Sequence, residues 1–390
     1  MSARVRHALL VGSLGLLLML TVLTAWSRWE VGEPPGDYRC FDAAAERFLA
    51  GDSIYVHEHD HFDSPPFFVW LTLPAHALGG AMGHALAMFA GLLLTGLALS
   101  LVRRALSRPP SVDAALTAAL YLPIWLSASI AQWGGAFFAA FAGTFFFAAR
   151  GRALEAGLMA SLFLAKPTLA LFVLPLVVLG LGRRALAGIG IGALGWAIAS
   201  LPLGLSIWPA WIAQLEWASG AQALAEHRWQ HHSLIGTLRA LAGELELDPS
   251  VARIAWAMIA VPLGAVTIFY ATRLLRRGDT TRAFSLVALA TVGLNVYVRY
   301  YDSLMVLVPA LALSMRPDRW RITGIVALTY VLLASVDAAY FQTGVPVPPE
   351  GLLLTVWLFL ELVEARRVLR AAPANPPVGQ RVSRSIPNLP

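Results

Sequence analysis

The sequence predicts an all-α membrane protein with about 10–12 transmembrane or re-entrant helices. Its 390 residues are 58% hydrophobic and only 13% charged, whereas a soluble globular protein carries roughly 25% charged residues. Apolar runs such as 7–26 and 83–102 are long enough to cross a hydrocarbon core of about 30 Å. These runs are too numerous for a signal peptide followed by a soluble domain. We therefore expect a multi-pass protein of the cell membrane.

Arginine clusters between the apolar runs predict the orientation of the helices. Clusters of this kind are typical of short cytoplasmic loops. They stand at Arg4 and Arg6, and in segments 103–108, 150–152, 183–184, 273–277, 316–321 and 366–370. Placing them all inside puts both termini in the cytoplasm. The same distribution argues against a nucleic-acid partner, although the net charge is +6.

Segment 153–182 is too short for the crossings that this orientation requires. Each full crossing needs roughly 20 residues, and the pair Lys166-Pro167 interrupts the apolar run near its middle. We expect two short helices that form a re-entrant or V-shaped hairpin, with Lys166 at the break. Broken helices at membrane depth occur where protein or a water-filled cavity satisfies the freed backbone groups. A cavity is therefore expected beside Lys166.

Two long polar segments are expected on the outer side, at about 27–64 and 208–249. The first contains nine of the chain's 23 acidic residues. Its apolar residues recur at helical spacing and predict an amphipathic helix on the membrane surface, ending near Gly51; they are Tyr38, Phe41, Ala45, Phe48 and Leu49. We treat residues 1–370 as one membrane-embedded domain and the polar, proline-rich segment 371–390 as a disordered cytoplasmic tail.

Lys166 is the only lysine among 29 basic residues. An ionisable side chain within a span costs roughly 2.5–3.5 kcal/mol on insertion scales and usually marks a functional cavity. The alternative is a lysine whose aliphatic chain carries its ammonium group to the membrane interface. We favour a functional role.

Two acids near the expected outer helix are candidates for a general base. Asp37 lies just ahead of the helix, and Asp42 lies within the segment predicted to be helical. A carboxylate at the membrane surface could accept a proton from a hydroxyl group. Aspartate at the start of a helix is also a common cap of the backbone N–H groups. On composition alone, the two acids are equal rivals.

Three histidines alternate with two acids in segment 57–61. In an extended segment the three imidazoles would lie on one face and could bind a divalent metal. No fourth ligand can be identified. A contact with substrate or phosphate is therefore preferred, and no metal site is predicted.

Further polar residues gather in the other segments assigned to the outer side. They are Gln132, Arg228, His231, His232, Arg299, Tyr301 and Asp302. Arg299 close to Asp302 could form a simple ion pair, and Gln132 could make a helix-end hydrogen bond. Cations that converge on a membrane cavity are also what a lipid phosphate or pyrophosphate requires.

Five motifs occur in an order found in a known family. They are Asp37-Tyr-Arg-Cys-Phe41 with Ala43-Ala-Ala45, Leu49-Ala-Gly51, Tyr55, Phe62, Pro65-Pro66 and Leu73-Pro74; Gln132-Trp133-Gly134; Ala156-Gly157 with Ala165-Lys166-Pro167-Thr168; His232-Ser233 with Arg239; and Tyr301-Asp302 before Pro309. Over roughly residues 10–365 the chain resembles the glycosyltransferase 87 family (DUF2029) of the GT-C superfamily.

The resemblance implies a GT-C-like fold and an inverting glycosyltransferase without a cofactor. A mannose-type hexose or an arabinofuranose would pass from a polyprenyl-phosphate-linked donor to a lipid or glycan acceptor of the envelope, on the outer face. Asp37 would be the general base. The donor phosphate would be bound by Lys166, Arg299, His231 and His232. Other substrate contacts are expected at Asp42, Tyr55, His61, Gln132, Tyr301 and Asp302.

Three positions depart from the family's usual residues. Ser64 replaces a tyrosine, His231-His232 replaces Asn-Gln, and Gly135 replaces an asparagine. The sugar and acceptor of the best-known members are therefore not carried over. The alternative is a multi-span transporter or flippase of a lipid-linked or anionic substrate, which would also explain the broken helix and its lysine. It would not explain the large acidic first outer segment, and the sequence shows no inverted halves.

Overall fold

The computed structural model describes residues 2–30, 36–56, 62–106, 110–218, 232–315 and 350–371. Within these ranges every regular element is a helix, so the prediction of an all-α chain is confirmed. Four helices are long and apolar enough to cross a membrane. They are α1 (Ala3–Glu30), α4 (Gly80–Ala105), α10 (Arg183–Ser200, extended by the turn Leu201–Leu203) and α14 (Pro249–Arg276).

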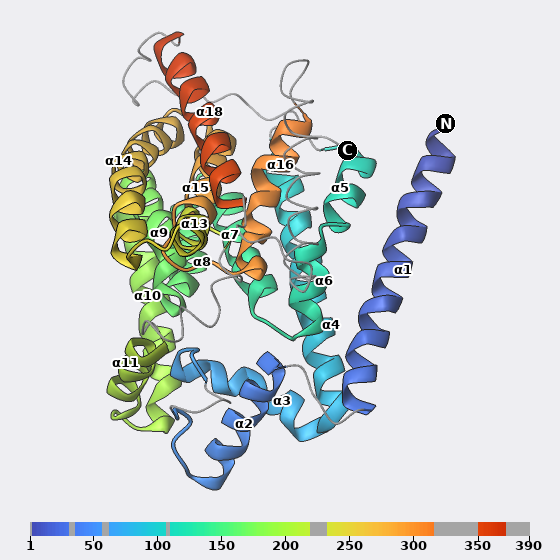
Figure 1. Cartoon of the computed structure of the whole chain (residues 1–390). Helices are drawn as coiled ribbons and strands as arrows, with labels where there is room; N and C mark the ends of the chain where they lie inside the picture. The colour runs from blue at the N-terminus through green and yellow to red at the C-terminus, as the bar shows by residue number, and fades with distance from the viewer. Residues whose placement is uncertain are drawn as a thin grey trace.

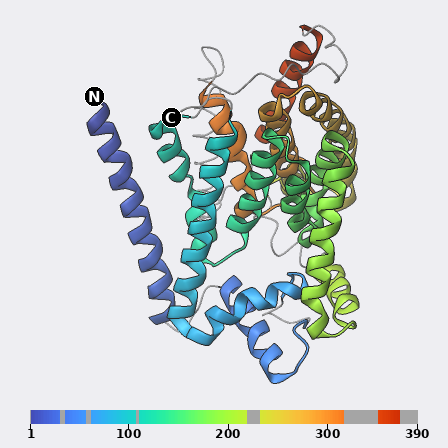
Figure 2. The same cartoon turned by 180° about the vertical axis from the view of Figure 1, so that it is seen from behind.

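Shorter helices complete the bundle (Figure 1). They are α5 (Val112–Ala119), α6 (Leu122–Ser129), α7 (Gly134–Ala149), α8 (Ala153–Ala160), α9 (Pro167–Leu181), α11 (Ile207–Ala218), α13 (Leu234–Glu244), α15 (Thr280–Gly293), α16 (Leu307–Ser314) and α18 (Glu350–Ala371). Nearly all of α15 is buried, whereas α1 stands at one edge of the bundle in both views (Figures 1 and 2). Exposed leucines on α1, α4 and α10 suit an environment of lipid rather than water.

Two helices lie across one end of the bundle, at the bottom of Figure 1: α2 (Gly36–Ala50) and α3 (Val69–Leu78). The predicted helix in the first outer segment is therefore confirmed. Its residues Tyr38, Phe41 and Ala45 are buried, while Leu49, in the last turn, is 63% exposed. Gly51 follows with φ +80°, a left-handed conformation that glycine adopts without strain and that ends the helix.

The predicted break at Lys166 is also confirmed. Helix α8 tightens into the 3₁₀ turn η2 (Ser161–Ala165), and α9 begins at Pro167. Proline suits this first helical position because its missing N–H would have no partner there, and its fixed φ favours a helix start. Lys166 itself has φ −136° and ψ 83°, so the chain changes direction at the lysine.

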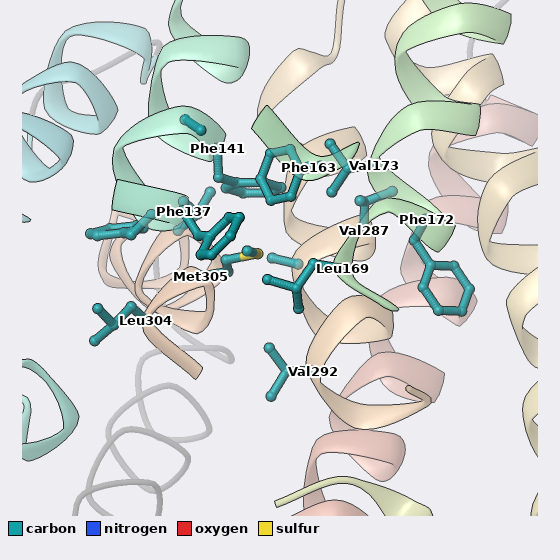
Figure 3. Close-up of a cluster of buried hydrophobic side chains, with 14 of the residues drawn as sticks. Phe137, Phe141, Phe163, Leu169, Phe172, Val173, Val287, Val292, Leu304 and Met305 are labelled. Atoms are coloured by element: carbon teal, nitrogen blue, oxygen red, sulfur yellow. The ribbon is translucent and has the colours of Figure 1, made fainter. Parts of the chain in front are cut away.

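A buried apolar cluster packs around this break (Figure 3). Phe163 precedes Lys166, and Leu169 follows it. Both belong to the same cluster as Leu304 and Met305 of the 3₁₀ helix η5 (Tyr300–Val306). Close-packed apolar side chains leave little room for rearrangement. The cluster therefore holds the hairpin break against η5, which carries Asp302.

Helices α8 and α10 approach each other closely because glycines replace side chains at their contact. A Cβ atom at Gly188 would clash with the backbone oxygen of Leu154, whereas nothing lies within 4 Å of one at Gly190. We expect Gly188→Ala to destabilise the protein by the roughly 1–3 kcal/mol typical of overpacking, measured as a lower thermal unfolding temperature in detergent. Gly190→Ala, on the same helix, is the control and should leave that temperature unchanged or raise it. Equal effects of both substitutions would contradict the close contact.

Candidate functional site

The centre of the site is an ion pair between the hairpin break and η5. Lys166 Nζ lies 2.6 Å from both carboxylate oxygens of Asp302. The side chain of Asp302 is fully buried, and that of Lys166 retains 18% exposure. The Tyr301 ring centroid lies 4.8 Å from Nζ, within the range of a cation–π contact. Lys166 is therefore not a lysine reaching for the interface: its ammonium group is held inside the protein.

Arg299 lies beside this pair. Its backbone N–H donates to Asp302 Oδ2 over 3.0 Å, and its guanidinium carbon lies 5.4 Å from the centroid of the Tyr297 ring. Asn295 Nδ2 donates to the carbonyl oxygen of Thr168 over 2.6 Å, which fastens the segment before η5 to the first turn of α9. One carboxylate, Asp302, thus organises two cationic residues.

Asp37, in the layer of α2 and α3, lies near the same group. It lies in the first turn of α2 and is close enough for its charge to interact with Lys166, Arg299 and Tyr301. The structure therefore brings together five of the predicted site residues: Asp37, Lys166, Arg299, Tyr301 and Asp302.

Two buried polar atoms beside these charges make no hydrogen bond within the described part of the chain. They are Thr168 Oγ1, in the first turn of α9, and Arg299 Nε. Buried polar groups nearly always have a partner, and the N-terminus of a helix favours an anion. Together with Lys166, these groups offer donors to a phosphate.

Gln132 lies between α6 and α7, where Ala131 adopts φ +57°. Its side-chain oxygen accepts a hydrogen bond from the N–H of Trp133 over 3.2 Å. A Cβ atom at the following Gly134 would lie 2.7 Å from the carbonyl oxygen of Tyr301. The Gln132 turn is therefore packed directly against the residue that precedes Asp302.

Asp42 and Tyr55, predicted as substrate contacts, make hydrogen bonds within the protein. Asp42 Oδ1 lies 2.8 Å from His76 Nδ1, and the Tyr55 hydroxyl donates to the carbonyl oxygen of Ser64 over 2.8 Å. Burial, assisted by the charge of Asp63, raises the pKa of Tyr55. Both hydrogen bonds connect parts of the segment that runs from α2 to α3.

His232 is buried next to the arginine segment. Its backbone N–H donates to the carbonyl oxygen of Val298 over 3.0 Å, and its Nδ1 lies 3.8 Å from Glu350 Oε1. That separation is too long for a hydrogen bond. Burial lowers the pKa of His232 from 6.5 to about 4, so the imidazole is neutral near pH 7. It could serve a phosphate as a hydrogen-bonding group rather than as a cation.

The low pKa of His232 predicts a loss of stability in acid. The unfolded chain binds the proton of this imidazole at a higher pH than the folded chain does. The contribution of neutral His232 to folding stability is therefore fully present above pH 6.5 and is lost as the pH drops toward about 4. We expect the wild type to lose up to about 3 kcal/mol more folding stability than His232→Gln over this range, seen as a larger fall in its thermal unfolding temperature. Parallel curves for the two proteins would show that His232 is not the titrating group.

Some predicted residues lie outside the described ranges. They are His231, Arg228 and the segment 57–61 that contains His61. Among the residues that are described, no three histidine, cysteine, aspartate or glutamate side chains gather where a metal ion could bind.

The sequence did not single out three residues near the site. Asp63 interacts electrostatically with Arg299 and Tyr297, and its Oδ1 accepts a hydrogen bond from Gln214 Nε2 over 3.1 Å. Asp63 was one of nine acids in its segment, with no feature to separate it. Gln214 lies in an apolar helix, where a lone amide could have been noticed. Tyr297 stands two residues before Arg299, in the same short polar segment that drew attention to Arg299.

Two comparisons found known proteins to which this chain is similar. A family model described as Glycosyltransferase family 87 matches residues 62–298. Among solved structures, the crystal structure of ArnT from Cupriavidus metallidurans in the apo state is 16% identical, covering 89% of this chain and 76% of that chain with a TM-score of 0.39. The comparison with curated proteins gave no match.

Proposed function

The chain belongs to glycosyltransferase family 87, and from that membership we propose that it transfers a sugar from a polyprenyl-phosphate carrier to a lipid or glycan acceptor of the cell envelope. The protein is a multi-pass membrane glycosyltransferase. The observation that carries the finer proposal is the cationic group at the hairpin break. Lys166 and Arg299 lie beside the N-terminus of α9, within electrostatic reach of the carboxylate of Asp37.

In the proposed reaction, Asp37 accepts the proton of an acceptor hydroxyl as its oxygen attacks the anomeric carbon of the donor. The bond between that carbon and the phosphate oxygen breaks on the opposite face, so the configuration inverts. The bonding electrons leave with polyprenyl phosphate. Lys166 and Arg299 stabilise the charge that develops on the departing phosphate. The proton on Asp37 is then released to water, and no covalent intermediate is required.

The proposed orientation has both termini in the cytoplasm and the site on the extracytoplasmic side. The arginine-bearing C-terminal ends of α4 and α14 lie at the same end of the bundle as the start of α1 (Figures 1 and 2). Helices α2 and α3 lie at the opposite end. This separation supports the orientation, because short arginine-rich segments favour the cytoplasmic side.

Reconstitution tests the proposal directly. Purified protein in liposomes would receive lipids extracted from a deletion strain, which should contain the accumulated acceptor. Radiolabelled polyprenyl phosphate mannose and polyprenyl phosphate arabinofuranose are tested as donors, with GDP-mannose as the control. We expect label to move to an extracted lipid or glycan from one lipid-linked donor and not from the nucleotide sugar. Movement of intact donor between leaflets without transfer would instead favour the flippase alternative.

A further inference from the structure

A second pair of polar side chains lies at the edge of the cationic group, outside the machinery described above. Gln214 of α11 is fully buried, and its Nε2 donates to Asp63 Oδ1 over 3.1 Å. The carboxylate can only accept, so this bond fixes which end of the amide faces it. Gln214 Oε1 is therefore left as an acceptor, and it takes no hydrogen bond from any residue that the structure describes.

The location of Asp63 connects this pair to the site. Its charge interacts with Arg299 and Tyr297, the residues that lead into η5. It is thus a third carboxylate near the cationic group, in addition to Asp37 and Asp302. Whereas Asp302 is held by the ammonium group of Lys166, Asp63 accepts a hydrogen bond from an amide, that of Gln214.

The chemistry of the pair identifies the type of ligand. Asp63 and Gln214 Oε1 are both acceptors, so a group that binds them must bring donors. A buried amide oxygen without a partner is unfavourable, and most such atoms are satisfied in the working protein. Phosphate has no hydrogen to give when ionised, whereas neighbouring hydroxyls of a sugar ring have one each.

We propose that Asp63 and Gln214 bind hydroxyl groups of the donor's sugar ring. This inference rests on the proposed function, because it takes the donor phosphate to lie at Lys166 and Arg299. The sugar is bonded directly to that phosphate, so it lies within one ring's width of Arg299, on which the charge of Asp63 acts. The pair would then select the sugar, while the cationic group binds the phosphate common to every polyprenyl-phosphate donor.

A purely structural role for the pair predicts a different result, and the chain offers a matched control. Trp211, on the same helix, donates its Nε1–H to the backbone oxygen of Asp63 over 3.1 Å. Trp211→Phe removes this attachment without touching either acceptor atom. Gln214→Met removes the amide while keeping a side chain of similar length. If the bonds to Asp63 only fasten the segment to α11, the two variants should behave alike.

The experiment measures binding of three lipids of equal chain length to the full-length protein in nanodiscs: polyprenyl phosphate, polyprenyl phosphate mannose and polyprenyl phosphate arabinofuranose. We expect the wild type to bind one glycolipid about tenfold more tightly than bare polyprenyl phosphate. Gln214→Met should abolish that preference and leave the affinity for bare polyprenyl phosphate unchanged. Trp211→Phe should retain the preference.

The outcomes separate the two proposals. Three results would overturn the sugar subsite alone. The preference for one glycolipid could survive in Gln214→Met, or it could be lost equally in Trp211→Phe. The wild type could also bind all three lipids with equal affinity. Failure of the wild type to bind any of the three lipids would overturn the proposed function and the subsite with it. Loss of affinity for bare polyprenyl phosphate in Gln214→Met would assign the amide to folding or to the phosphate, and would also overturn the subsite.

Discussion

Replacing Asp37 with asparagine is expected to reduce sugar transfer about 10²–10⁴-fold, the range attributed to a general base. Asparagine keeps the size and most hydrogen bonds of the side chain but cannot accept the acceptor's proton at neutral pH. The loss should appear in kcat, measured in liposomes with saturating donor. Binding of polyprenyl phosphate should be retained, because Asp37 does not contact the phosphate in the proposed reaction.

The matched control is Asp42→Asn, the same chemical change on the same helix. Asp42 is paired with His76 over 2.8 Å, so this variant should lose some stability in the layer of α2 and α3 but retain transfer within a few-fold. If Asp42→Asn were inactive and Asp37→Asn active, the base would be Asp42. Full activity of both variants would show that neither Asp37 nor Asp42 is the base.

Replacing Lys166 with alanine is expected to lower kcat/KM for the lipid donor about 10²–10³-fold, as the loss of one charge-stabilising donor does elsewhere. The substitution also leaves Asp302 buried without its counter-ion, which costs roughly 3–5 kcal/mol of folding stability. Activity must therefore be measured per folded protein, at a temperature well below the unfolding transition of the variant.

The double variant Lys166→Ala with Asp302→Ala separates these two effects. It removes the stranded carboxylate along with the lysine, so stability should recover toward that of the wild type while transfer remains low. Recovery of transfer together with stability would contradict a role for Lys166 on the phosphate. It would leave the ion pair as a purely structural contact between the hairpin and η5.

The features that follow from local sequence were predictable. The break at Lys166 follows from the length of segment 153–182 and from a proline, and α2 follows from the spacing of its apolar residues. Both depend on geometry that acts over a few residues, which a single sequence carries directly.

The partners within the site were not predictable in the same way. Lys166 and Asp302 were each identified, but they are 136 positions apart, and nothing in either segment indicates that they pair. The same holds for Asp42, whose partner His76 lies on another helix. Burial of His232, which lowers its pKa, depends on packing among elements remote in the chain. The sequence shows which residues are charged. Which of them are buried, and which partners they have, depends on the tertiary structure.

The Lys166–Asp302 pair also bears on the exit of the spent carrier. Asp302 holds the ammonium group from both carboxylate oxygens. In the proposed reaction, an incoming lipid phosphate therefore exchanges one anion for another instead of meeting an unpaired charge. The net gain in binding free energy is the difference between the Lys166–phosphate and Lys166–Asp302 interactions, not the whole of the first. After transfer, Asp302 is already in place to reclaim Lys166 from polyprenyl phosphate. If the proposed reaction is correct, a resident anion of this kind favours release of polyprenyl phosphate and weakens binding of the donor.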